Sequence, residues 1–365
     1  MPQVTAERLA ELIKTMCRRS GSAEREAQLV ADHLVAANLS GHDSHGVGMM
    51  PAYIAAVRED RLRPNTVATV ALDSGPFLVV DGNGGYGQVV AHEAIERAIA
   101  KARVEGLCLM ALRNAHHIGR IGHWGELCAA AGFISIHYVN AISHRAVVAP
   151  HGGADARFVT NPYCTAIPAM DGEPPVILDF ATSLIAMGKV RVAHNKGEAV
   201  PEGALIDADG RPTRDPGVMF AEPRGALRSM GQQKGYGLAL VCDILAGALS
   251  GGGTFLPERL ARNTIINNML AIVLDPARFG EIGAIGAEMA AFQHWVRASP
   301  PAPGVERVML PGEPERRSRA ERLARGVPVD ARTWEELVAT AAGIGIGRAE
   351  FERIAGHGGS GAAHA

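Results

Sequence analysis

The sequence of 365 residues carries little net charge, few aromatic residues and few cysteines. A net charge of -2 provides no basic field that would attract nucleic acid or an anionic membrane surface. The five cysteines are scattered, odd in number and free of Cys-x-x-Cys pairs, which argues against a disulfide framework and favours a reducing cytoplasm. The N-terminus lacks the basic and apolar regions of a signal peptide, and no apolar run could span a bilayer. We therefore expect a cytoplasmic protein without nucleic-acid or membrane partners.

The hydrophobic residues, 47% of the chain, are mainly aliphatic and follow helical and strand periodicities. The length fits two domains of roughly 150 residues each. Residues 193–225 are rich in Gly, Pro, Asp and Arg, and we expect them to form an extended surface excursion. Thr333-Trp334-Glu335-Glu336 has the form of a capping box. The patterns predict helices over 5–16, 24–39, 88–104, 123–131, 235–249 and 333–342, and strands over 67–72, 77–80, 107–112, 134–139, 176–180 and 265–274.

The stretch Gly41-His42-Asp43-Ser44-His45-Gly46-Val47 combines two imidazoles, an acid and a hydroxyl between glycines. Glycine allows the backbone to bend and to approach a ligand closely. An imidazole held by polar neighbours can transfer protons near neutral pH. The alternative interpretation is a polar turn that closes the preceding helix.

Gly82-Asn83-Gly84-Gly85-Tyr86-Gly87 fits the pattern G-x-G-x-x-G between an expected strand and an expected helix. That is the context of a Rossmann dinucleotide loop. The next strand, however, runs into Arg113-Asn114 and offers no acid to bind a ribose. A glycine-rich structural turn explains the same residues.

The loop from Asn114 to His123 contains three histidines, His116, His117 and His123. They could be zinc ligands, but adjacent histidines project in different directions and no H-E-x-x-H is present. A catalytic or substrate-contacting imidazole is the better-supported interpretation, because neighbouring glycines allow a ligand to approach closely.

Three further stretches are individually weak. Residues 177–183 form an apolar strand that runs into Asp179 and hydroxyls, and residues 310–313 form a Pro-Gly turn. Gln233-Lys234-Gly235 lies at an expected helix start, where a cation and free amides suit an anion. Taken one at a time, a solvated turn or a capped helix explains each stretch.

Taken in order, these stretches resemble one family, the malate/L-lactate dehydrogenases that lack a Rossmann fold. The stretches Gly41–Pro51 and His116–Trp124 most resemble its hydroxycarboxylate dehydrogenase B branch. The resemblance covers nearly the whole chain, and the ordered set is specific where single motifs are not. It rests on Asp43-Ser44-His45-Gly46-Val47, Asp81-Gly82-Asn83-Gly84, His116-His117-Ile118-Gly119, residues 148–153, Thr160-Asn161-Pro162, residues 178–183, Lys234-Gly235-Tyr236-Gly237 and Leu310-Pro311-Gly312-Glu313.

The resemblance implies an α+β fold with a largely antiparallel central sheet and a helical domain built from both chain ends. We expect residues 1–75 with 320–358 to form that helical, substrate-side domain, residues 76–319 to bind NAD or NADP, and residues 359–365 to be disordered. The implied reaction is reversible hydride transfer between the nicotinamide cofactor and C2 of a 2-hydroxy or 2-oxo acid. The family works as homodimers, and its glycine turn at Gly82 is structural.

The resemblance also implies the roles of individual residues. His45 is the expected proton donor, oriented by Ser44 or Asp43, with His117 as its partner or substitute. Many relatives carry an Arg where this chain has Met49, so Arg120 and Arg145 are the expected partners of the substrate carboxylate. Gln233 stands where relatives often carry His. The expected cofactor contacts are Thr160, Asn161, Asp179, Ala181, Ser183, Lys234, Gly235, Gly312 and Glu313.

Three alternatives remain at this point. Within the family, the chain could reduce cyclic imino acids or oxidise a ureidoglycolate-type substrate. From another class, a zinc-dependent hydrolase could use the loop from His116 to His123. A ligand-binding module without catalytic activity is the third.

Overall fold

The protein is described by a computed structural model that covers residues 2–142, 145–262 and 264–356. The tail expected to be disordered, 359–365, lies outside these residues. Over the described ranges, the structure contains no helix of the length and apolarity needed to cross a bilayer.

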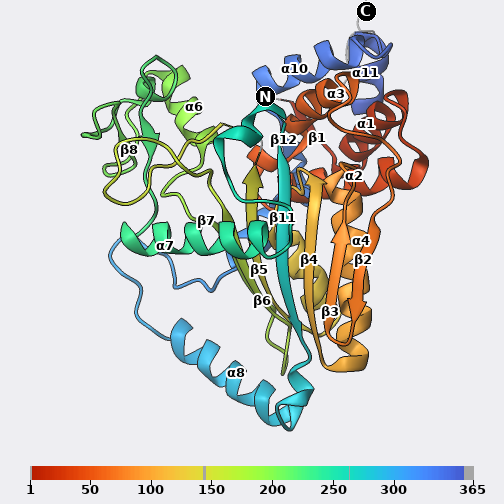
Figure 1. Cartoon of the computed structure of the whole chain (residues 1–365), viewed down its shortest axis with the longest axis vertical. Helices are drawn as coiled ribbons and strands as arrows, with labels where there is room; N and C mark the ends of the chain where they lie inside the picture. Colours follow the sequence, from red (N-terminus) through yellow and green to blue (C-terminus); the bar gives the residue numbers. More distant parts are fainter. Residues whose placement is uncertain (1, 143–144, 263, 357–365) are drawn as a thin grey trace, which may run out of the picture.

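A seven-stranded sheet forms the centre of the molecule (Figure 1). Its strand order is β2-β3-β4-β11-β5-β6-β7, and β3 with β4 is its parallel pair, while the other neighbours are antiparallel. This confirms the expected α+β fold with a largely antiparallel sheet. The strands are β2 (Thr69–Ser74), β3 (Phe77–Asp81), β4 (Leu107–His116), β5 (Ile134–Ile142), β6 (Pro162–Ile167), β7 (Val176–Ala181) and β11 (Ile266–Leu274).

Helices cover the sheet. On β4, alternate residues such as Cys108, Met110 and Leu112 are buried and share one apolar core with α4 (Gly87–Glu105) and α5 (Gly122–Ala130). Figure 1 shows α7 (Gln233–Cys242) crossing in front of the sheet, and a π-helix, η4 (Asp243–Ala248), continues it. The sequence predicted one helix over 235–249, so the π-helical turn is a departure from the expected periodicity.

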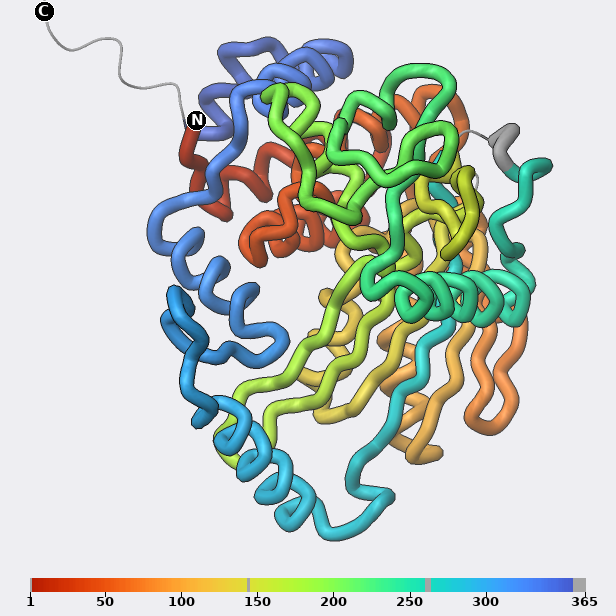
Figure 2. Tube along the Cα trace, turned by 90° about the vertical axis from the view of Figure 1, so that its left-hand side faces the viewer, coloured from red at the N-terminus to blue at the C-terminus, as the bar shows by residue number. Residues whose placement is uncertain are grey.

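The two ends of the chain build one helical lobe, as expected. Figures 1 and 2 show the red and blue ends of the chain lying side by side at the top. A single apolar core joins Leu9, Leu34 and Tyr53 to Leu337 and Phe351. The lobe contains α1 (Ala6–Arg19), α2 (Glu24–Leu39), α3 (Met50–Arg58), α10 (Ala331–Ala342) and α11 (Arg348–Ala355), with β1 (Gln3–Val4) paired to β12 (Val327–Pro328). We propose that the apolar core of this lobe and the core of the central sheet belong to two separate domains.

The segment expected to be an irregular excursion is instead part of a compact lobe. Val200, Leu205 and Met219 of this segment are buried in a small core that also contains Val148 and Val190. The expectation was wrong because the strands are only two residues long, too short to show an alternating pattern. The lobe contains α6 (Met187–Lys196), η3 (Pro216–Met219) and the sheet of β8 (Leu205–Ile206), β9 (Pro212–Thr213) and β10 (Ala226–Leu227).

Among the helices that were not predicted, two stand out. The first is α8 (Ile282–Arg297), whose Phe292 and Trp295 face solvent, so the segment lacks a clear core-facing pattern. The second is α9 (Glu313–Arg325), a highly charged helix with no buried residue, which follows the Leu310–Gly312 turn. Four short helices complete the described elements: η1 (Asp43–His45), η2 (Val47–Met49), η5 (Pro257–Arg262) and η6 (Pro276–Arg278).

Helix and strand ends differ from expectation most clearly at α10 and β4. The N-cap of α10 is Asp330, whose carboxylate accepts the Thr333 N–H at 2.9 Å, so the capping box expected at Thr333 was placed three residues late. Strand β4 continues to His116 through Asn114, which has a left-handed backbone (φ +53°).

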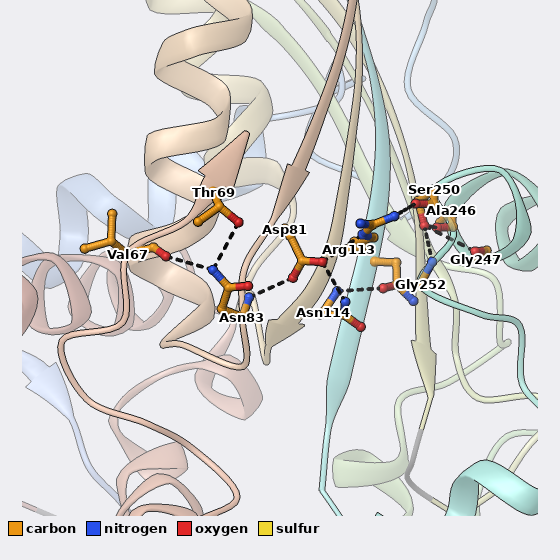
Figure 3. Close-up of polar contacts among 11 residues, drawn as sticks. Val67, Thr69, Asp81, Asn83, Arg113, Asn114, Ala246, Gly247, Ser250 and Gly252 are labelled. Carbon is orange, nitrogen blue, oxygen red and sulfur yellow. Dashed lines mark hydrogen bonds and ion pairs between the residues drawn. The ribbon is translucent and has the colours of Figure 1, made fainter. Parts of the chain in front are cut away.

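The glycine turn after β3 has a structural role in the fold. Figure 3 shows Asp81 between Asn83 on one side and Arg113 and Asn114 on the other. The Asp81 carboxylate accepts hydrogen bonds from the backbone of Asn83 (3.0 Å), Arg113 Nε (2.8 Å) and Asn114 Nδ2 (3.0 Å). A side chain at Gly82 would lie 3.0 Å from the Ala115 Cα atom. The turn therefore fastens β3 to the end of β4, as the structural interpretation of the motif expected.

Candidate active site

The His45 loop leaves α2 through Gly41, whose φ of +83° suits glycine. Residues Asp43–His45 form a single turn of 3-10 helix, η1. The buried amide of Asn38 shapes this turn, because Oδ1 accepts the Val47 N–H at 2.9 Å and Nδ2 donates to Asp43 Oδ1 at 2.6 Å. A side chain at Gly46 would lie 2.2 Å from that Asn38 oxygen, so the loop packs directly on the amide.

Asp43 and Ser44 have different partners. The Asp43 carboxylate binds the Arg322 guanidinium of α9 through two contacts of 2.6 and 3.0 Å. The Ser44 hydroxyl lies 3.0 Å from His45 Nδ1. Of the two groups that could orient His45, the structure therefore places Ser44 against the ring and turns Asp43 to Arg322. No pattern in the sequence pointed to Arg322, which is 279 residues from Asp43.

The imidazoles of His45 and His117 lie side by side, with ring centroids 5.6 Å apart and planes inclined by 22°. His117 Nδ1 is 2.7 Å from the phenol oxygen of Tyr53, which accepts a hydrogen bond from Gln88 Nε2 at 2.8 Å. Burial raises the pKa of the Tyr53 phenol, which favours its neutral form. We assign the phenol hydrogen to His117 Nδ1, because Tyr53 then both donates to the imidazole and accepts from Gln88. A neutral His117 then carries its proton on Nε2.

Arg120 is a buried cation with unused donors. Its side chain is 2% exposed, and Nη2 pairs with Glu126 at 2.5 Å. Nη1 lies 3.9 Å from Asp179, whose carboxylate accepts the Gly122 N–H at 2.8 Å. Neither Nε nor Nη1 has a hydrogen-bond acceptor among the described residues. A buried guanidinium with free N–H groups is suited to bind a carboxylate.

His33 supports the backbone of Arg120. This histidine of α2 is fully buried, and its Nε2 accepts the Arg120 backbone N–H at 3.0 Å. A side chain at Gly119 (φ +71°) would lie 2.0 Å from the same nitrogen. The sequence analysis missed His33 because it stands within an amphipathic helix, far from any motif.

Burial determines the electrostatics of this cluster. It lowers the pKa of His45 to about 4, with smaller contributions from His42 and Arg120. It also lowers the pKa of His116 to about 4 and raises that of Asp179, although Arg120 opposes the latter shift. The imidazoles of His45 and His116 are therefore neutral at pH 7 in the free protein.

Several expected cofactor residues meet at the end of β7. Thr182 connects the loop after β7 to the segment before β6. Its N–H donates to the Thr160 carbonyl at 3.3 Å, and its hydroxyl donates to the Asn161 carbonyl at 2.9 Å. A side chain at Gly235 would lie 2.9 Å from the Thr182 carbonyl, so the start of α7 packs here and leaves Lys234 exposed. Ala181 ends β7, and the Ser183 hydroxyl donates to the Ile185 carbonyl at 3.0 Å.

Gly312 and Glu313 lie at the opposite end of β7, where the Ile177 N–H bonds the Pro311 carbonyl at 3.2 Å. The Glu313 carboxylate accepts the Leu310 N–H at 2.8 Å and contacts Arg307 at 3.3 Å, so it holds its own loop. The Asn161 side chain is buried and donates to the Ala239 carbonyl at 3.0 Å. Arg145 is exposed in the loop after β5.

The three histidines considered as zinc ligands face different partners. His116 Nε2 lies 3.1 Å from the Thr264 hydroxyl, His117 contacts Tyr53, and His123 packs its ring 4.4 Å from that of His33. Within the described parts of the chain, no three His, Cys, Asp or Glu side chains are grouped to hold a metal ion.

Comparisons with known proteins agree with this architecture. Residues 4–338 match the family described as malate/L-lactate dehydrogenase. The chain is 46% identical over 343 residues to hydroxycarboxylate dehydrogenase B of Escherichia coli (strain K12), which covers 93% of this chain and 94% of that protein.

Solved structures agree as well. Sulfolactate dehydrogenase from Methanocaldococcus jannaschii matches with a TM-score of 0.84 at 31% identity, over 95% of this chain and 98% of that one. Delta1-piperideine-2-carboxylate reductase from Pseudomonas syringae pvar. tomato matches with a TM-score of 0.80 at 28% identity, over 93% and 100%. The resemblance seen in the sequence is confirmed, and the chain belongs to the malate/L-lactate dehydrogenase family of oxidoreductases.

Proposed function

We propose that the protein is an NAD(P)-dependent 2-hydroxycarboxylate dehydrogenase that interconverts a 2-hydroxy acid and a 2-oxo acid. The observation that carries the proposal is the pairing of His45 and His117 beside the buried guanidinium of Arg120. One imidazole can exchange a proton with the oxygen on C2 while the other donates a hydrogen bond to it. A cation with free donors can bind the adjacent carboxylate. The nicotinamide cofactor supplies or accepts the hydride at C2.

In this proposal His45 transfers the proton. When a 2-oxo acid is reduced, the carbonyl oxygen gains a proton from His45 as C2 gains a hydride, and the charge of an alkoxide is avoided. In the reverse direction the neutral imidazole accepts the hydroxyl proton. Ser44 orients the ring through Nδ1, and His117 donates a hydrogen bond from Nε2 to the substrate oxygen. Arg120 binds the carboxylate, with Arg145 as the alternative to be tested.

The proposed cofactor residues lie on and around β7, an edge strand of the sheet. Gly312 packs on Ile177 at its start, and Ala181 and Ser183 stand at its end. Six residues of strand span about 20 Å, which suits an extended dinucleotide. The residues proposed to contact it are Thr160, Asn161, Asp179, Ala181, Ser183, Lys234, Gly235, Gly312 and Glu313. For Asn161 and Glu313 the backbone is the available contact, since their side chains bind within the protein.

A homodimer is part of the proposal. Trp295 and Phe292 on α8 are 77% and 65% exposed, and Leu240, Ile244 and Leu249 expose a second apolar face on α7 and η4. Large exposed apolar side chains gathered on a helix commonly mark an interface between protein chains. We assign both faces to contacts with a second copy of this chain.

We also place the protein in the cytoplasm. All five cysteines are free and buried. Burial raises the pKa of Cys17, Cys108, Cys128 and Cys242 to about 12, which makes their thiols poor nucleophiles. Free thiols of this kind are typical of proteins in a reducing compartment.

The second candidate substrate class is a cyclic imino acid. The observation that favours it is the structural match to a reductase named for delta1-piperideine-2-carboxylate. Such a substrate also carries a carboxylate next to the carbon that accepts hydride, so Arg120 would serve both classes. A ureidoglycolate-type 2-hydroxy acid is a further alternative within the family.

The purified protein is expected to oxidise NADH or NADPH in the presence of a 2-oxo acid without added metal. The histidine loop lacks a group of side chains suited to a metal among the described residues, so the proton donor is a side chain. A panel of 2-oxo acids, cyclic imino acids and ureidoglycolate, read at the cofactor absorbance, measures this. EDTA is the control: activity that EDTA removes and zinc restores would show that a metal site does the chemistry.

Lys234→Ala is expected to raise the Michaelis constant of NAD(P)H more than that of the 2-oxo acid. Lys234 is exposed in the first turn of α7, where a cation and the helix N-terminus together favour phosphate. Initial rates with each substrate varied in turn separate the two constants. Lys196→Ala, at the exposed end of α6, is the matched control and is expected to change neither. Equal effects of Lys234→Ala on both constants would indicate that Lys234 contacts the 2-oxo acid instead.

A further inference from the structure

A line of buried polar side chains crosses the sheet beneath the π-helix. Asp243 opens that helix, Asn140 lies on β5, and Asn267 and Asn268 are neighbours on β11. All four side chains are at most 5% exposed. The pairing of β11 with β4 is irregular at these two asparagines, where a β-bulge shifts the register. Bulges of this kind commonly redirect side chains next to functional sites.

Each hydrogen bond along this line is donated toward Asp243. Asp243 Oδ1 accepts from Asn140 Nδ2 at 2.9 Å, and Asn140 Oδ1 accepts from Asn268 Nδ2 at 2.9 Å. Asn268 Oδ1 then accepts the backbone N–H of Asn114 at 3.0 Å. The second carboxylate oxygen of Asp243 accepts from Asn161 Nδ2 at 3.2 Å.

The Asp243 carboxylate and the Gly253 carbonyl set that direction together, because Gly253 also accepts from Asn140 Nδ2 at 3.0 Å and from Asn268 Nδ2 at 3.4 Å. The two ends of an asparagine amide have the same size, so shape alone does not decide which end faces a neighbour. A carboxylate accepts at both oxygens, so Asn140 must turn its nitrogen to Asp243 and its oxygen to Asn268. Asn268 must in turn offer nitrogen to Asn140, which leaves its oxygen for Asn114. The partly buried N–H of Asn114 would otherwise lack an acceptor among the described residues, at a cost of up to about 1–3 kcal/mol.

Both ends of the catalytic histidine segment depend on this line. Asn114 has a left-handed backbone and precedes His116 and His117 by two and three residues. On the other side, Asn267 Oδ1 accepts the Ile118 N–H at 2.9 Å, while Asn267 Nδ2 donates to the Asn140 carbonyl at 2.9 Å. The segment from Asn114 to Ile118 is thus fixed at each end through Asn140.

Two glycines make room for the amides. A side chain at Gly247, within the π-helix, would lie 2.6 Å from Asn140 Nδ2. A side chain at Gly252 would lie 1.9 Å from Asn268 Oδ1. The extra residue in a π-helical turn commonly accompanies a functional site. The backbone around the line is therefore shaped to admit it.

We propose that Asp243 is a positioning residue for His117, acting through the directed hydrogen bonds of Asn140 and Asn268. The inference rests on the proposed function, because His117 is assigned there to the substrate oxygen. It adds a residue of the π-helix, on the opposite side of the sheet from the α4 and α5 layer, to those that set the geometry of the reaction. Asn161, expected to contact the cofactor, joins the same line through its side chain.

Asp243→Asn tests the proposal because it preserves size and changes only the pattern of donors and acceptors. Its single amide oxygen cannot replace both carboxylate oxygens. Whichever way the amide turns, its nitrogen faces the amide nitrogen of Asn140 or that of Asn161, and both asparagines belong to the line. A misplacement of about 1 Å can lower a rate about 100-fold, so kcat for the 2-oxo acid is expected to fall by about 10- to 100-fold. The Michaelis constant of NAD(P)H is expected to stay nearly unchanged. Asn268→Ser, which removes the acceptor for Asn114, is expected to reproduce the loss.

Hydrogen exchange separates this proposal from the proposed function. Amide exchange in Asp243→Asn is expected to rise selectively over residues 114–118, whether or not the wild-type protein reduces any acid tested. Asn65→Ser is the matched control: its amide bridges Ala23 N–H at 2.7 Å and the Gly21 carbonyl at 2.8 Å in the helical lobe. That variant is expected to lose stability and keep kcat. Unchanged kcat and exchange in Asp243→Asn, or a uniform rise in exchange along the chain, overturns the proposal.

Discussion

His45→Ala is expected to lower turnover with a 2-oxo acid by about 100-fold or more, because a positioned acid typically contributes that factor. NAD(P)H binding, followed by fluorescence, is expected to stay nearly unchanged, since the proposed cofactor residues lie on and around β7 rather than in the His45 loop. His117→Ala is the matched variant and is also expected to impair turnover, through substrate placement. Near-normal turnover in His45→Ala, with a large loss in His117→Ala, would identify His117 as the proton donor.

The pH dependence of the wild-type enzyme follows from the same histidine. Burial lowers the pKa of His45 to about 4, so the charged acid becomes scarcer as pH rises above 4. The value of kcat/KM for 2-oxo acid reduction is therefore expected to fall with rising pH, by up to tenfold per unit. Oxidation needs the neutral imidazole, so its kcat/KM is expected to rise through pH 4 and then level. Opposite slopes would contradict the assignment of His45.

Arg120→Lys is expected to lower kcat/KM for the 2-oxo acid by about 100-fold. The substitution keeps a positive charge beside Glu126 but removes the planar fork that can bind a carboxylate with two hydrogen bonds. Hydrogen bonds to charged groups contribute about 1.5–3 kcal/mol, and 3 kcal/mol corresponds to about 100-fold. The loss is expected mainly in the Michaelis constant of the acid. Initial rates over a range of acid concentrations, with NAD(P)H saturating, measure it.

Arg145→Lys is the control for that experiment. Arg145 is exposed after β5, whereas Arg120 is 2% exposed and has two N–H groups without an acceptor among the described residues. We expect Arg145→Lys to leave kcat/KM nearly unchanged. If the two variants behave in the reverse way, Arg145 binds the carboxylate and Arg120 is a structural cation.

Much of the fold was predictable because local patterns determine it. Thr5 caps α1 at the start of the helix predicted over 5–16, and the apolar spacing of α2 matches the buried positions of that helix. The strands with strict alternation were found within a few residues. The short strands of the small lobe, the solvent-facing α8 and the charged α9 carry no such pattern, so their segments could not be assigned. The π-helix was missed because its start continues the period of α7.

The sequence by itself determined the family and the chemical types at the site. The glycine-framed histidine loop, the second histidine loop and the ordered motifs were sufficient for that, because each is a run of neighbouring residues. The tertiary structure alone decided which groups meet. Ser44 rather than Asp43 faces His45, Tyr53 and Gln88 reach His117, and Arg322 and His33 hold the loops. These contacts join residues far apart in the chain, and burial then shifts the pKa of His45, neither of which a linear pattern records.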